Sequence, residues 1–170
     1  MRRSVPILVM ALGLTVILFG VIAARYSRLL ASPGDAPLPM SIAGLLLEDF
    51  AFGEEAVVEI TRLHRAEFPL TSGAMGSYGG HAEIRLWSTG TVNRLVAAKM
   101  VSAMRNAIGA GNAPFISVSE ANYNGRTIYR VDGMGQQHYY FHVGDFVIWF
   151  AAESSLADQA LDEVLEFYHE

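Results

Sequence analysis

Residues 5–24 form one run, VPILVMALGLTVILFGVIAA, that contains no charged side chain. A helix of this length spans roughly 30 Å, which is the thickness of the hydrocarbon core of a bilayer. Arg2 and Arg3 precede the run, and Arg25 and Arg28 follow it. The pattern predicts a single-pass transmembrane anchor over residues 1–30, with the lipid bilayer as a partner of the chain.

A cleaved secretory signal peptide is the alternative interpretation of this run. Such peptides have an apolar segment of about 7–15 residues. The run here is longer and two arginines follow it, which favours an uncleaved signal-anchor. The free amino terminus adds positive charge in front of the run. The expected topology therefore places the N-terminus in the cytoplasm and the C-terminal domain outside it, in a periplasmic or extracellular space.

Small residues recur along one side of the expected anchor. Gly13, Ile17, Gly20 and Ala24 follow one another at steps of three or four residues. Small side chains allow two membrane helices to approach closely, so this stripe predicts a packing face for another membrane protein. The alternative is that glycine and alanine are simply common in membrane helices.

Residues 31–39, ASPGDAPLP, have the composition of a linker, because prolines prevent a helix from continuing. Residues 40–170 then form one globular domain of ordinary size. The chain has no cysteine, which excludes disulfides, thiolate nucleophiles and cysteine-ligated metals. From residue 29 onward it carries 8 basic and 17 acidic side chains, a balance that makes nucleic acid an unsuitable partner.

Periodicity in the domain predicts an α+β fold in which an antiparallel sheet of about four or five strands is packed by two or three helices on one face. Helices are expected over residues 54–66 and 91–108 and from residue 154 or 155 onward, where Ser155 and Asp158 resemble a capping box. A strand is expected over residues 81–87. The glycine-rich residues 72–80 are interpreted as a loop or a broken edge strand.

Residues 115–152 are typical of a β-meander. Asn124-Gly125 is a strong signal for a two-residue hairpin, since a type I′ turn needs two positive φ angles. Further turns are expected at residues 133–135 and at Gly144-Asp145. Four short strands joined by tight turns imply antiparallel pairing.

Motifs that carry catalysis are missing from the sequence. It contains no HExxH, no G-x-S-x-G and no GxxxxGK[ST] pattern. His138 and His142 lie about 13 Å apart along an extended strand, too far for one metal ion. We therefore expect a protein that is not an enzyme, with no catalytic residue, no metal and no cofactor.

The meander concentrates aromatic residues. Strand alternation places His138, Tyr140 and His142 on one face, with Trp149 on the matching face of the next strand. These four residues form either a half-exposed platform for a partner or ligand, since Tyr and Trp suit contact surfaces, or part of the core beneath a helix.

Together these patterns predict a membrane-anchored, non-catalytic domain that acts as an accessory or assembly subunit of a membrane protein complex. The alternative is a membrane-tethered ligand-binding or sensory domain that binds a small molecule, or a hydrolase without a recognisable signature.

Overall fold

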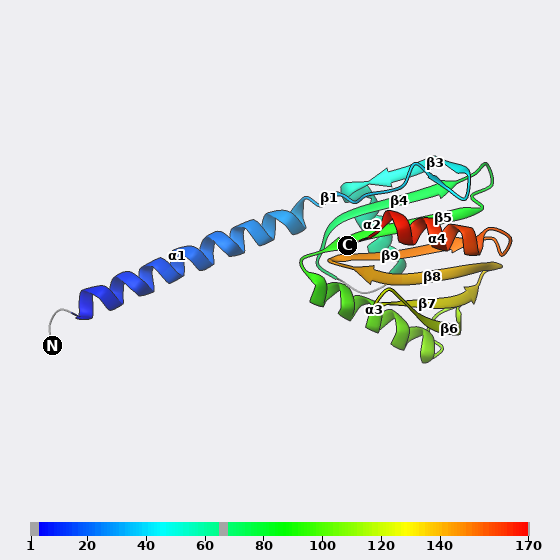
Figure 1. Ribbon diagram of the computed structural model, residues 1–170. Helices are drawn as coiled ribbons and strands as arrows, with labels where there is room; N and C mark the ends of the chain where they lie inside the picture. Colours follow the sequence, from blue (N-terminus) through cyan, green and yellow to red (C-terminus); the bar gives the residue numbers. More distant parts are fainter. Residues whose placement is uncertain (1–3, 65–67, 170) are drawn as a thin grey trace. The chain divides into compact units, whose positions relative to one another are not determined.

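The computed structural model describes residues 4–64 and 68–169, with side chains for residues 12–28, 30–63 and 68–169 (Figure 1). The chain divides into two compact units, residues 1–32 and residues 33–170. The first unit consists of helix α1 (Ser4–Ala31). The second contains the sheet and, in its described residues, the helices α2 (Gly53–His64), α3 (Arg94–Gly109) and α4 (Ala157–Phe167).

The predicted transmembrane anchor is wrong. In the described part of the chain, no helix combines the length and the apolar character that crossing a membrane requires. Helix α1 continues through Arg25 and Arg28 to Ala31. The predictions of a single-pass topology and of a membrane localisation depended on this anchor and are wrong for the same reason.

The sheet is larger than expected, with nine strands in the described residues rather than the four or five predicted. Its order is β2-β3-β4-β5-β9-β8-β7-β6, and β1 pairs with β4. All neighbours are antiparallel except β1 and β4, which are parallel. The strands are β1 (Gly34–Asp35), β2 (Ser41–Ile42), β3 (Leu45–Phe52), β4 (Leu70–Tyr78), β5 (Ile84–Thr91), β6 (Ile116–Tyr123), β7 (Arg126–Gly133), β8 (Gln136–Val143) and β9 (Phe146–Ala152).

Strand β4 is one of the strands that the sequence analysis did not predict. The glycine-rich stretch predicted as a loop or broken edge strand lies inside the sheet, between β3 and β5. A Cβ at Gly73 would lie 2.7 Å from Val57 Cγ2 of α2, and one at Gly76 would lie 2.7 Å from Leu47 Cδ1. These glycines therefore allow close packing on the strand instead of ending it.

Helices cover both faces of the sheet, not one face as predicted. Helices α2 and α3 contribute Ile60, Met100 and Met104 to the core on one face. Helix α4 contributes Ala160 and Val164 to a separate core on the other face. In Figure 1, α4 lies in front of the strands, with α2 and α3 on the opposite side. Each strand near the centre therefore has two buried faces, which accounts for the high aromatic content of the meander.

The segment predicted as a linker packs against the sheet. Strand β1 pairs with β4, and Ala36 is buried. The hydroxyl of Tyr78 donates to the carbonyl of Pro39 at 2.9 Å, and that of Tyr168 donates to the carbonyl of Pro37 at 2.6 Å. The proline-rich stretch therefore bridges β4 and the end of α4.

The meander is confirmed as strands β6 to β9. The predicted hairpin turn is confirmed as well, because Asn124 and Gly125 have φ angles of 50° and 81° between β6 and β7. The ladder between β7 and β8 runs from Gly133–Gln136 to Tyr129–Tyr140 and stops there. The first three residues of β7 therefore separate from β8, which leaves an opening beside the hairpin.

Candidate functional site

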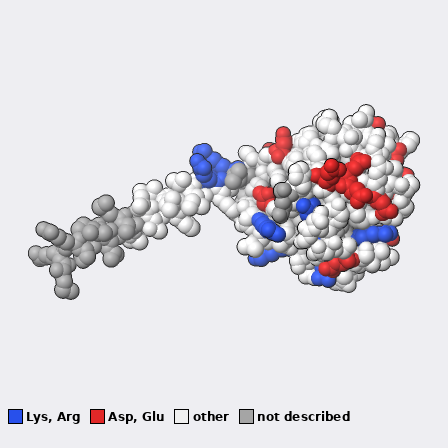
Figure 2. Space-filling model, viewed as in Figure 1, with Lys and Arg blue, Asp and Glu red and all other residues white. Residues whose placement is uncertain are grey.

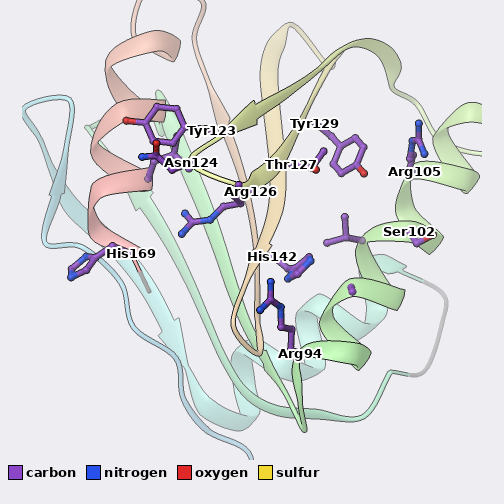
Figure 3. A pocket seen from close by; sticks show the side chains of 14 residues that line it. Arg94, Ser102, Arg105, Tyr123, Asn124, Arg126, Thr127, Tyr129, His142 and His169 are labelled. Atoms are coloured by element: carbon purple, nitrogen blue, oxygen red, sulfur yellow. The ribbon is translucent and has the colours of Figure 1, made fainter.

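A cleft of about 520 Å³ lies where β7 separates from β8 (Figure 3). Thr127 of β7 and His142 of β8, which would face each other if the ladder continued, both line it. One side of α3 forms a wall, and the hairpin turn forms another. Leu165 and His169, at the C-terminal end of the chain, complete the lining. A volume of this size is typical of small-molecule sites.

The cleft is cationic. Arg94, Arg105 and Arg126 line it together with His142 and His169, and among the described residues no carboxylate belongs to its lining. The domain holds only eight basic side chains against seventeen acidic ones, so three of its eight basic residues meet in one cavity. In the view of Figure 2, acidic side chains form a band over α4 while basic ones are scattered. The cleft is therefore a local positive region on an acidic domain.

Helix α3 supplies two of the arginines from one face. Arg94, Ala98, Val101 and Arg105 line the cleft at helical spacing. Asn93 caps the helix by accepting a hydrogen bond from Val96 N at 3.1 Å, which fixes the turn that carries Arg94. Within the described residues, Arg94 forms no ion pair. Its guanidinium is thus a donor available to an anion in the cleft.

Arg105 is held in position by two contacts. It pairs with Glu120 of β6 at 2.8 Å, and its guanidinium carbon lies 5.6 Å from the ring centroid of Tyr129. Contact with an aromatic face and with a carboxylate orients the planar guanidinium. Since Glu120 offsets part of its charge, we expect Arg105 to contribute less to anion binding than Arg94.

The hairpin turn places the third arginine. Asn122 Oδ1 accepts a hydrogen bond from Gly125 N at 3.0 Å, which stabilises the turn. Arg126 follows immediately, with its guanidinium carbon 5.4 Å from the ring centroid of Phe141. Tyr123, Asn124 and Thr127 line the cleft beside it, so the turn supplies hydrogen-bonding groups as well as charge.

Three of the four predicted face residues form one cluster. Tyr140 and Trp149 stack with ring centroids 4.9 Å apart and planes 8° from parallel. The indole N–H of Trp149 donates to His138 Nδ1 at 3.1 Å. His138 Nε2, which must then carry the proton, donates to the carbonyl of Gly133 at 3.0 Å. The ring of Phe115 lies over the cluster, 4.8 Å from His138 and 5.1 Å from Trp149.

Burial sets the ionisation of this cluster. It lowers the pKa of His138, although the hydrogen bond to the carbonyl of Gly133 acts in the opposite direction. Burial also raises the pKa of Tyr140 to about 12, and the neighbouring Tyr129 adds to this effect. His138 and Tyr140 are buried, whereas Trp149 is half-buried. The cluster is thus largely covered, and only the fourth predicted residue, His142, lines the cleft.

The predicted packing face on α1 remains a prediction. Gly13, Ile17, Gly20 and Ala24 all lie on α1, and a Cβ at either glycine would meet nothing within 4 Å. Among the described residues, no group of three His, Cys, Asp or Glu side chains could hold a metal ion.

The three arginines of the cleft were not recognised from the sequence. Arg94 and Arg105 lie 11 positions apart on one face of α3, and the opening of the β7–β8 ladder brings Arg126, a further 21 positions along the chain, to the same cleft. One signal was present, since Arg126 directly follows the strongest turn in a sequence with few basic residues.

Comparison of the chain with protein-family models, with curated proteins and with solved structures gives no match in any of the three.

Proposed function

We propose that residues 33–170 form a non-catalytic binding domain for a small anion that carries phosphate or carboxylate groups. The observation that supports this most strongly is the lining of the cleft, in which three arginines and two histidines meet and, within the part of the chain that the structure describes, no carboxylate takes part. Arginine matches the geometry of both anionic groups through its fork of N–H donors. The hydroxyls of Ser102, Tyr123 and Thr127 in the same cleft would add hydrogen bonds.

The size and shape of the cleft support a ligand of metabolite size. A volume of about 520 Å³ suits a compact polyanion better than a single inorganic ion.

The proposal is tested by calorimetric titration of the full chain with citrate and, separately, with inorganic phosphate at low ionic strength. We expect one equivalent of citrate to bind. Arg94→Gln and Arg126→Gln should each weaken binding at least about tenfold, because a hydrogen bond to a charged group contributes roughly 1.5–3 kcal/mol.

Arg62→Gln is the matched control, because it removes the same charge from α2, where the arginine pairs with Glu59 outside the cleft. Equal losses in all three variants would show that net charge alone attracts the anion. No binding of either anion by the wild type would refute the proposal.

A further inference from the structure

A second cavity, of opposite charge, lies between α2 and the strands β3, β4 and β5. Its volume is about 1170 Å³, and Met75 and Trp87 of neighbouring strands line it together with one side of α2. None of the residues that line this groove also lines the cationic cleft. It is thus a separate surface, with an elongated wall provided by the helix.

The groove exposes large apolar side chains. Phe50 on β3 and Val58 and Leu63 on α2 are 57%, 62% and 56% exposed and line the same cavity. Scattered apolar residues are normal on a protein surface, but a group that lines one cavity is typical of a contact site. Trp87 lies in the wall, and its buried indole N–H has no hydrogen-bond acceptor among the described residues.

The rim of the groove is acidic. Among the described residues, Arg85 is the single Lys or Arg that lines the groove. The described lining contains five carboxylates, those of Glu48, Asp49, Glu54, Glu55 and Glu59. Glu59 pairs with the exposed Arg62 at 2.6 Å. The other four form no ion pair within the described residues. The charge is therefore available to an occupant.

We infer that this groove binds a segment of a partner protein in which large apolar residues are interspersed with lysine or arginine. The apolar side chains would pack on Phe50, Val58 and Leu63, while the cationic groups would face the carboxylates of the rim. Complementary charge steers such a segment to the groove and excludes acidic partners. Nucleic acids and anionic lipid surfaces would be repelled by the same rim.

The test measures binding of a fluorescein-labelled, twelve-residue peptide built from leucine, phenylalanine and lysine, by fluorescence anisotropy with the full chain. Two further peptides serve as controls, one with glutamate in place of lysine and one with serine in place of the apolar residues. We expect the first peptide to bind at least about tenfold more tightly than either control. Equal binding of the first peptide and the serine peptide would overturn the inference, because apolar contact would then contribute nothing.

Paired variants locate the binding site. Glu54→Lys with Glu55→Lys should weaken binding of the peptide about tenfold or more. Asp162→Lys with Glu166→Lys makes the same change of charge on exposed positions of α4 and should change affinity less than threefold. Equal losses in the two double variants would mean that the peptide follows net charge, which contradicts a defined groove.

Two more variants test the apolar wall. Phe50→Ser should weaken binding about tenfold, whereas Leu95→Ser, at a residue 74% exposed on α3, should leave it unchanged. Sedimentation of the full chain tests whether a second copy is the occupant. A dimer that the double variant Glu54→Lys with Glu55→Lys dissociates would overturn the assignment to a different protein.

Discussion

Tyr129 and Tyr140 are the last partners in the β7–β8 ladder, and their rings stack with centroids 5.0 Å apart. On one side of this pair the sheet is continuous, and Tyr140 stacks in turn on Trp149 of β9. On the other side the strands separate, and Thr127 and His142 line a cleft instead of pairing. The two tyrosines thus mark the boundary between the core and the candidate binding site.

Replacing Tyr129 with alanine should destabilise the domain. The change removes a stacked ring from Tyr140 and the aromatic face next to Arg105. We expect a loss of about 1–3 kcal/mol in the free energy of unfolding, since aromatic and cation–π contacts each contribute about 0.5–1.5 kcal/mol. This loss is measured by urea unfolding monitored with circular dichroism. Tyr123→Ala, at a residue 47% exposed on β6, is the control, and a loss as large there would contradict the role given to the stack.

The buried His138 should make stability depend on pH. Burial lowers its pKa in the folded state, so the unfolded chain binds a proton first as the pH falls. The stabilising contribution is fully present above the unfolded pKa of about 6.5 and is lost as the pH falls through the folded pKa. Urea midpoints between pH 7.5 and 5 should therefore fall further in the wild type than in His138→Gln. If the urea midpoint falls with pH by the same amount in both proteins, His138 does not titrate in this way.

Four tyrosines should resist ionisation in alkali. Burial raises the pKa of Tyr140 to about 12 and raises the pKa values of Tyr78, Tyr139 and Tyr168 as well. Stability from these groups is present below the unfolded pKa of about 10 and is lost as the pH rises from there through the folded pKa values. Absorbance at the tyrosinate band should show a late, cooperative step that coincides with unfolding. Tyr78→Phe should reduce the amplitude of that step, and an unchanged amplitude would contradict the prediction.

Gly133 should not tolerate a side chain. A Cβ there would lie 2.5 Å from Phe115 Cδ1 and 2.7 Å from the carbonyl oxygen of Pro114. Gly133→Ala therefore has to displace the segment that covers Trp149, at a cost of about 1–3 kcal/mol. The tryptophan emission should shift to longer wavelength as water reaches the cluster. In the control Gly80→Ala, where a Cβ would meet nothing within 4 Å, neither stability nor emission should change appreciably.

Local signals in the sequence predicted the regular parts of the meander. The Asn124-Gly125 turn depends on two backbone angles, and alternation identifies the faces of a strand without knowledge of its neighbours. Helix α3 was anticipated for the same reason. The start of α4 was not, because the helix begins after Leu156 and no side chain caps it, so the resemblance of Ser155 and Asp158 to a capping box was misleading.

The remaining features depend on contacts between distant segments. Gly73 and Gly76 resemble turn residues until α2 and Leu47 are seen to pack against them. The cleft was missed because Arg94 and Arg126 are brought together by the premature end of a strand ladder, which no local pattern encodes. The apolar run misled in another way, because its composition alone did not establish a membrane span.

An NMR titration of the isotope-labelled full chain with citrate tests the central claim most directly. The account predicts saturable shifts at one equivalent, concentrated at the backbone amides of Gly125, Arg126, Thr127 and His142 and in the first turns of α3. Shifts spread over the surface, shifts centred on the groove beside α2, or no saturable shift at all would contradict an anion-binding site in the opening between β7 and β8.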